Sequence, residues 1–255
     1  MKAVLICAHG SSENSNGDAA VSHAEYIRNR TSMPVYCCYH EHQKPSSKEI
    51  VSLMAADGVD EIVAIPLFFA PGFLANRMLP KELGMEPGQL EGEVVVNGKP
   101  ILIHITGVFG NHPLMKDVMK EVMEKYAYPV KDTSVILIGH GSKDPANSKT
   151  VEFNASFVRD MGYRTVCAYN EMQSPTVEDA LDLAIKSKAP HIIAIPMFVS
   201  PSNHSVNEIP EKLGLDGSRR RTIETDDGVI ELEYADEVGL SSGISEILLE
   251  RSREY

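Results

Sequence analysis

Short apolar runs alternate with helix-length amphipathic segments along the whole chain, and this order occurs twice. The runs Ala3–Ala8 and Val135–Gly139 are short enough to be buried parallel strands, and a segment with helical spacing follows each of them. A second strand, a helix and a third strand come next in each half, and the third strands are expected over Glu61–Phe69 and His191–Val199. Strands that alternate with helices through short connections predict a doubly wound α/β sheet.

Each half closes with a predicted hairpin and a final helix. The dipeptides Asn97-Gly98 and Asp227-Gly228 favour tight hairpin turns. The final helices are expected over Pro113–Tyr126 and Ser242–Arg253. This internal duplication predicts two similar α/β domains, each a doubly wound parallel sheet, that face a central cleft and span residues 1–129 and 130–255.

One stretch is repeated closely, and the two copies differ at a chemically important place. Ile65–Gly84 reads IPLFFAPGFLANRMLPKELG, and Ile195–Gly214 reads IPMFVSPSNHSVNEIPEKLG. In both copies a short apolar strand breaks at a proline, and a later proline opens a helix. His204 lies in the polar loop of the second copy, whereas Leu74 takes its place in the first. Because leucine offers no lone pair, only the second copy keeps a ligand-type side chain there.

Side chains that can bind metals follow the strands of the second half. His140 begins a His-Gly-Ser turn after the first strand, Glu171 follows the second strand, and His204 follows the third. Ligands of open α/β sheets bind outside the carboxyl ends of the strands, so we expect these three side chains on one rim. Two imidazoles and a carboxylate suit Co²⁺, Fe²⁺, Ni²⁺ or Zn²⁺. The same groups can accept protons near neutral pH.

Each of these histidines also has a structural interpretation. Taken alone, His140 could cap the strand-to-loop turn through a hydrogen bond, and His204 could be a solvated loop residue. In the first half, His9 and Glu41 form an incomplete counterpart of the rim set. A secondary metal site remains an alternative there, because imidazoles flank Glu41 on both sides, at His40 and His42.

The amino-acid composition argues against several classes of binding partner. The formal net charge of −12 argues against a general nucleic-acid or anionic-membrane binder, since both need a basic footprint. No apolar run approaches the roughly 20 residues of a membrane span. The four cysteines form no CxxC pair and are expected to be reduced thiols in a cytoplasmic protein. Without a Walker loop or a GxGxxG motif after a strand, nucleotide binding is unsupported.

The order of these motifs resembles the class II tetrapyrrole metal chelatases, in particular the sirohydrochlorin cobaltochelatases (CbiX-like proteins). The resemblance rests on the strand-to-His-Gly-Ser turn, the glutamate a few residues before a proline, and the apolar strand followed by Pro, His and Pro. It extends over nearly the whole chain, once in each half. The first half also keeps Gly107–Pro113 (GVFGNHP), which is similar to a family segment before the last helix.

The resemblance implies an ATP-independent enzyme that inserts a divalent metal, Co²⁺ in the first instance, into sirohydrochlorin for cobalamin biosynthesis. Carried over by position, His140 and His204 would handle the metal and accept protons, and Glu171 would assist. Residues 130–255 would then hold the active site, and residues 1–129 a degenerate one. Because sirohydrochlorin carries several carboxylates, the substrate is expected to contact cationic and polar rim residues: Lys143, Ser142, Arg77 and Lys44.

Several alternatives stay open at the level of sequence. Iron for siroheme, or nickel, would suit the same ligands as cobalt. A non-catalytic carrier of tetrapyrrole or metal would keep the fold without turnover. A hydrolase using Ser11 or Ser142 is a third alternative, although no nucleophile–base pair is evident. The oligomeric state is also open, and a homo-oligomer is compatible with the sequence.

Overall fold

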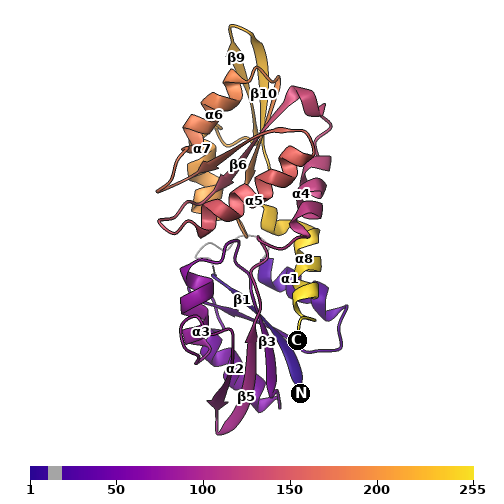
Figure 1. Cartoon of the computed structure of the whole chain (residues 1–255), viewed down its shortest axis with the longest axis vertical. Coiled ribbons are helices and arrows are strands. Elements are labelled where there is room, and N and C mark those ends of the chain that lie inside the picture. The colour runs from indigo at the N-terminus through magenta and orange to yellow at the C-terminus, as the bar shows by residue number, and fades with distance from the viewer. Residues whose placement is uncertain (11–18) are drawn as a thin grey trace. The chain divides into compact units, whose positions relative to one another are not determined.

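Two compact α/β units make up the chain (Figure 1). The computed structural model describes residues 1–10 and 19–255. Unit 1 consists of Met1–His112 together with Ser242–Tyr255, and unit 2 consists of Pro113–Ser241. Among the described residues, no helix has the length and apolar character needed to cross a membrane.

Unit 1 is built on a five-stranded sheet with the order β2-β1-β3-β5-β4. The first four strands in this order are parallel, and only β4 runs antiparallel, against β5. The strands are β1 (Lys2–Ala8), β2 (Val35–Tyr39), β3 (Glu61–Pro66), β4 (Glu91–Val96) and β5 (Lys99–Ile105). The helices are α1 (Ala19–Arg28), α2 (Ser47–Ala56), the π-helix η1 (Leu74–Met78), α3 (Leu79–Glu82) and α8 (Ser242–Arg251).

Unit 2 repeats this plan with the order β7-β6-β8-β10-β9, and β9 is its antiparallel edge strand. Its strands are β6 (Thr133–Gly139), β7 (Arg164–Tyr169), β8 (His191–Pro196), β9 (Arg220–Thr225) and β10 (Gly228–Tyr234). Its helices are α4 (Met115–Glu124), η2 (Val130–Asp132), α5 (Ala146–Asp160), α6 (Val177–Lys186), the π-helix η3 (His204–Glu208), α7 (Ile209–Lys212) and η4 (Val238–Leu240).

The apolar runs form the central strands because helices cover the sheet. All seven residues of β6 are buried, as expected for a parallel strand covered on both faces. Helices α2 and α6 each begin with a capping box, formed by Ser46 with Glu49 and by Thr176 with Asp179. The predicted duplicated α/β fold and both hairpins are confirmed.

The repeated stretch differs from its prediction in two respects. Strands β3 and β8 end at Pro66 and Pro196, before the predicted ends, because proline has no N–H to donate to the sheet. The predicted polar loop around His204 is instead helical. His204 opens the π-helix η3, in which the Ile209 N–H donates to the His204 carbonyl oxygen.

The final helix of each sequence half belongs to the other half's unit. Helix α8 packs on α1 in unit 1, and α4 packs on α5 in unit 2. The imidazole Nδ1 of His23 lies 2.7 Å from the Ser245 hydroxyl, which ties α8 to α1. The predicted boundary between residues 129 and 130 follows the sequence repeat. The compact units have different bounds, because the last helix of each half packs in the unit formed by the other half.

Glycine is required at one backbone crossing in each unit. Gly141 has a φ of +87°, and a Cβ built on it would lie 1.8 Å from the Glu171 carbonyl oxygen. Gly10 and Glu41 form the same crossing in unit 1, at 1.9 Å. A side chain at either glycine would therefore displace the loop that carries the neighbouring glutamate.

We expect Gly141→Ala to destabilise the protein much more than Gly217→Ala. Gly217 has a similar φ of +69°, but nothing lies within 4 Å of its added Cβ, so this variant measures conformational strain alone, about 1–2 kcal/mol. Gly141→Ala adds a backbone clash worth at least about 2 kcal/mol more. Urea unfolding midpoints compare the two variants, and equal midpoints would contradict the close approach.

Candidate metal and proton-transfer site

Three adjacent parallel strands bring the site of unit 2 together. His140 directly follows β6, Asn170 and Glu171 follow β7, and His204 opens η3 after β8. Since β6 lies between β7 and β8 and all three are parallel, their carboxyl ends share one edge of the sheet. The site therefore combines residues that are far apart in the sequence.

The two imidazoles predicted for the site lie next to each other. The ring centroids of His140 and His204 are 4.6 Å apart, and the rings meet edge to face at 84°. Two imidazoles bound to one tetrahedral ion through bonds of 2.0–2.1 Å would have ring centres roughly 5 Å apart. The observed spacing is thus close to that of a shared metal ion, and both rings are only partly buried.

Hydrogen bonds at Nδ1 define which ring nitrogens can act as ligands. His140 Nδ1 lies 2.9 Å from the Gly141 carbonyl oxygen, and His204 Nδ1 lies 2.8 Å from Glu208 Oε2. A carbonyl or carboxylate oxygen can only accept, so each Nδ1 carries the proton. The lone pair of each neutral ring is then on Nε2, where it can bind a metal or take up a proton.

A chain of polar contacts holds His204 in this orientation. The Lys212 ammonium donates to both the backbone oxygen and Oδ1 of Asn170, each at 2.7 Å. This fixes the Asn170 amide so that its NH₂ donates to Glu208 Oε2 at 2.8 Å, and Glu208 accepts from His204. Hydrogen bonds from His204 and then Asn170 lower the pKa of Glu208. Glu208 is thereby kept as an anion beside the imidazole.

The donor atoms of Glu171, His204 and Glu208 lie within 4.8 Å of one another. Within residues 1–10 and 19–255, this is the one group of three or more histidine, cysteine or carboxylate side chains that meets this spacing. His140 contacts the group through His204 but is not a member. The structure therefore joins predicted Glu171 and His204 to a carboxylate that the sequence interpretation did not select.

The sequence interpretation missed Asn170, which follows β7, and it missed Glu208 and Lys212 because the segment around His204 was interpreted as a loop. In a helix, residues four apart lie on one face, so His204 and Glu208 would have been paired by helical spacing. Lys212 lies a further four residues along the chain. A helical interpretation of His204–Lys212 would therefore have found Glu208 and Lys212.

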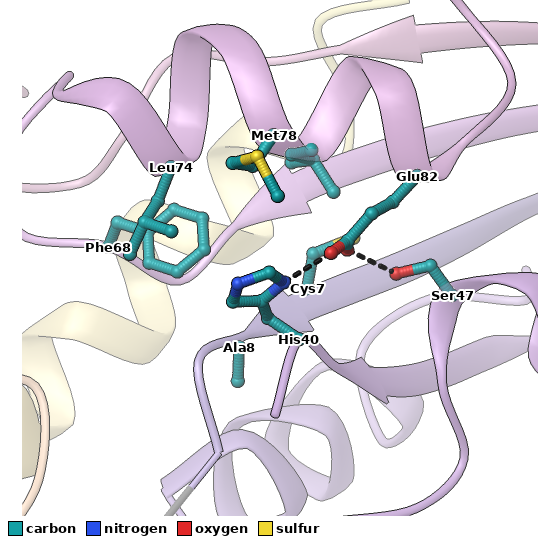
Figure 2. Close-up of a pocket in the computed structure, with 9 residues that line it drawn as sticks. Cys7, Ala8, His40, Ser47, Phe68, Leu74, Met78 and Glu82 are labelled. Atoms are coloured by element: carbon teal, nitrogen blue, oxygen red, sulfur yellow. Dashed lines mark hydrogen bonds and ion pairs between the residues drawn. The ribbon is translucent and has the colours of Figure 1, made fainter. Parts of the chain in front are cut away.

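At the corresponding place in unit 1, apolar side chains leave only a small pocket (Figure 2). Leu74 packs against the core cluster that contains Phe68, and both line a pocket of only about 10 Å³ together with Met78. The same pocket is also lined by polar side chains: His40 Nδ1 pairs with the Glu82 carboxylate, to which the Ser47 hydroxyl donates at 3.0 Å. A space of this size holds about one water molecule.

The residues expected to contact substrate are spread over both units. In unit 2, Lys143 is exposed, and the backbone N–H of Ser142 donates to the Gln173 side chain at 3.3 Å. In unit 1, Arg77 is exposed on η1. The Lys44 ammonium donates to both carboxylate oxygens of Glu49, at 3.0 and 3.1 Å. Ser11, the other hydrolase candidate, lies outside the described residues.

Replacing Glu208 should change the pH dependence of stability. Because the folded pKa of Glu208 is lowered, its hydrogen bonds stabilise the protein above the unfolded value of 4.5 and are lost as the pH falls through the folded pKa. Glu208→Gln should cost about 1 kcal/mol at pH 7, a modest amount because the carboxylate is 33% exposed. Urea unfolding between pH 3 and 7 measures the difference.

Glu211→Gln, an exposed carboxylate on α7, is the matched control for that experiment. The difference between wild type and Glu208→Gln should shrink as the pH falls below 4.5. A difference that stays constant over this range would show that the Glu208 carboxylate contributes no pH-dependent stability.

Comparison with known proteins places this chain in a family. The CbiX family model matches residues 3–126 and again residues 134–255. A sirohydrochlorin cobaltochelatase of Methanopyrus kandleri is 31% identical over 136 residues, which cover 48% of this chain and 95% of that protein. A sirohydrochlorin ferrochelatase of Priestia megaterium is 25% identical over 217 residues, which cover 84% of this chain and 78% of that protein.

A solved structure agrees with the fold. SirB from Bacillus subtilis with Fe³⁺ matches 99% of this chain and 94% of its own with a TM-score of 0.76. At 17% identity, this likeness concerns the fold alone. The two matches of the family model cover nearly the whole sequence and coincide with its two halves. The chain therefore belongs to the CbiX family and contains two copies of the family's domain.

Proposed function

We propose that this chain is a sirohydrochlorin chelatase that inserts Co²⁺ into the tetrapyrrole without ATP, and that unit 2 carries the active site. The observation that carries the proposal is the edge-to-face pair of His140 and His204, with the carboxylates of Glu171 and Glu208 beside it. Family membership supports the reaction class. The name of the Methanopyrus kandleri relative supports cobalt.

Metal insertion requires ligands that hold the ion and then release it. A hydrated divalent ion must lose water, and the four nitrogens of the macrocycle must replace the protein ligands. Glu171 and His204 offer a carboxylate and an imidazole, with the Glu208 carboxylate beside them and without the thiolates that would retain the ion tightly. Neutral imidazole and carboxylate are suited to borderline divalent ions.

Insertion also releases two pyrrole protons for each ion incorporated. His140 lies outside the three-donor group, and its Nδ1–H is donated to the Gly141 carbonyl oxygen. Its Nε2 lone pair is therefore available as a proton acceptor beside the metal. We assign His204 Nε2 and Glu171 to the metal, Glu208 to holding the His204 ring through its Nδ1–H, and His140 to proton uptake and transient metal contact.

The acidic groups of the substrate call for cations around the site. Lys143 is exposed two residues after Gly141 in unit 2 and is the first candidate, with the adjacent polar Ser142. Arg77 and Lys44, the other two cations expected from the sequence, belong to unit 1, and Lys44 pairs there with Glu49. An exposed pair of this kind contributes little to stability, so Lys44 could leave Glu49 for another carboxylate.

Replacing either imidazole should abolish insertion without abolishing substrate binding. We expect His204→Ala and His140→Ala each to lower the rate of Co²⁺ insertion by about 10²-fold or more, because each removes a ligand or base at the reacting centre. Absorption changes of sirohydrochlorin follow insertion, and its fluorescence quenching follows binding. Glu211→Gln, outside the three-donor group on α7, is the control and should insert at the wild-type rate.

Two results would contradict this proposal. If the wild-type protein inserts no metal faster than a protein-free control, the chain is a carrier of tetrapyrrole or metal. If insertion persists in His140→Ala and His204→Ala, the active site lies elsewhere.

The metal preference has its own measurement. Under anaerobic conditions, the wild-type protein is given sirohydrochlorin with equal concentrations of Co²⁺, Fe²⁺ or Ni²⁺, and the initial rates are compared. Co²⁺ is expected to be inserted fastest. A higher rate with Fe²⁺ would instead assign the chain to siroheme formation, as the name of the Priestia megaterium relative suggests.

A further inference from the structure

The buried side of the π-helix η3 carries a group of polar residues. Ser205 directly follows His204 and is fully buried. Its hydroxyl donates to Glu237 Oε1 at 2.6 Å, and its backbone oxygen accepts from the Tyr234 hydroxyl at 2.8 Å. Tyr234 and Glu237 are themselves 4% and 2% exposed. These three residues form a buried polar triad inside unit 2, next to the residue that carries the imidazole.

The tyrosine of the triad supplies a hydrogen bond that the π-helix cannot make. In a π-helix each N–H donates to the carbonyl oxygen five residues earlier, as Ile209 does to His204. The donor for the Ser205 carbonyl oxygen would be Pro210, which has no N–H. The Tyr234 hydroxyl takes the place of that donor. Burial raises the pKa of Tyr234, so its hydroxyl keeps the proton that it donates.

The glutamate of the triad is costly to bury. Glu237 Oε1 accepts from Ser205, whereas Oε2 makes no hydrogen bond with the residues that the structure describes. The Ser205 hydroxyl accepts from the Ser202 N–H at 3.1 Å and gives its single proton to the nearer acceptor, Glu237. A buried carboxylate with so few partners is expensive, and apolar residues of similar volume would often be at least as stable. Stability alone therefore gives no reason for a carboxylate at this position.

Unit 1 has an apolar version of the same arrangement. The pairing of β5 with β3 and of β10 with β8 aligns the ends of the two hairpins. The matching residues are Ala75 for Ser205, Ile105 for Tyr234 and Val108 for Glu237. All three apolar side chains belong to the hydrophobic core cluster of unit 1. The π-helix η1 forms there as well, so a π-helix at this position does not require the polar triad.

We propose that Glu237 is a positioning residue for metal insertion, because through Ser205 it fixes the main chain that presents the His204 imidazole. This role rests on the function proposed above. Glu208 holds the ring of His204 at Nδ1, and the triad holds the adjoining backbone. Reacting groups must be held within about 0.5 Å of their productive positions, which a contact to the ring alone does not ensure. Unit 1, with Leu74 at the matching place, has no ligand to position there.

A variant that copies unit 1 tests this role. Ser205→Ala/Glu237→Val removes the hydroxyl and the carboxylate together, so neither is left buried without the other. We expect its urea unfolding midpoint to equal or exceed that of wild type, because unit 1 packs the same side chains in its core. The kcat for Co²⁺ insertion should nevertheless fall about tenfold or more, while KM for sirohydrochlorin stays within about twofold.

Three single variants identify the hydrogen bond as the cause. Glu237→Gln keeps an oxygen that can accept from Ser205, so its kcat should stay within about threefold of wild type. Glu237→Val should lose as much kcat as the double variant, because both remove the same bond, and Ser205 can then donate to the Ser202 carbonyl oxygen. Thr150→Val is the control. It removes a buried hydroxyl that donates to the Ala146 carbonyl oxygen in α5, and it should insert at the wild-type rate.

Imidazole NMR of the metal-free, full-length chain reports on the position of His204 without an insertion assay. The ring signals of His204 are assigned by their loss in His204→Ala. We expect them to shift or broaden in Ser205→Ala/Glu237→Val and to stay at their wild-type positions in Thr150→Val. Glu237→Gln should change them less than the double variant does.

The outcomes separate the positioning role from the proposed function. Wild-type kcat in the double variant, or a lowered kcat with unchanged His204 signals, would overturn the positioning role and leave the proposed function intact. A loss of kcat that Glu237→Gln shares in full would overturn positioning through this hydrogen bond. A wild-type protein that inserts no metal would contradict the proposed function, and the His204 signals would then decide whether the triad positions the ring.

Discussion

The shared carboxyl edge of three parallel strands is the constraint on which the proposed chemistry depends. Strands β6, β7 and β8 end side by side, so the residues that follow them meet although long segments of sequence separate them. The glycine crossing at Gly141 and the π-helix that begins at His204 then set the two imidazoles 4.6 Å apart. The side chains provide the reactive groups, and the positions of the strand ends determine which of these groups lie close enough to act together.

The two units share one backbone fold but carry different side chains at matching positions. Unit 1 keeps the strand order, the glycine crossing and the π-helix of unit 2. Leu74 and Met78 occupy the places of His204 and Glu208, and His40 with Glu82 replaces Asn170 with Lys212. The pair that holds the site in unit 2 thus carries a positive charge, whereas its counterpart in unit 1 contains a carboxylate. Because backbone contacts maintain the fold, these exchanges leave it unchanged.

The sequence was sufficient for the fold and for part of the site. Apolar runs flanked by helical spacing identified the strands, and the Asn-Gly and Asp-Gly turns identified both hairpins. The strand-end rule brought His140 and His204 together correctly. It could not find Glu208, because the proline-flanked segment was interpreted as a loop and the π-helix was not foreseen. Nor could periodicity show which unit a closing helix packs on, since an amphipathic face marks a helix as packed but does not identify its partner.

The last helix of each half packs in the unit of the other half, and this affects the order in which the units can fold during synthesis. Helix α8 packs on α1 in unit 1, although the whole of unit 2 lies between the two helices in the sequence. During synthesis, the surface of α1 that α8 covers stays uncovered until residues 242–251 have been translated. The first half of the chain therefore cannot complete unit 1 by itself, whereas each domain of a simple tandem could fold without the other. A half-length polypeptide with this topology would have to fold its own terminal helix back or borrow one from a second copy.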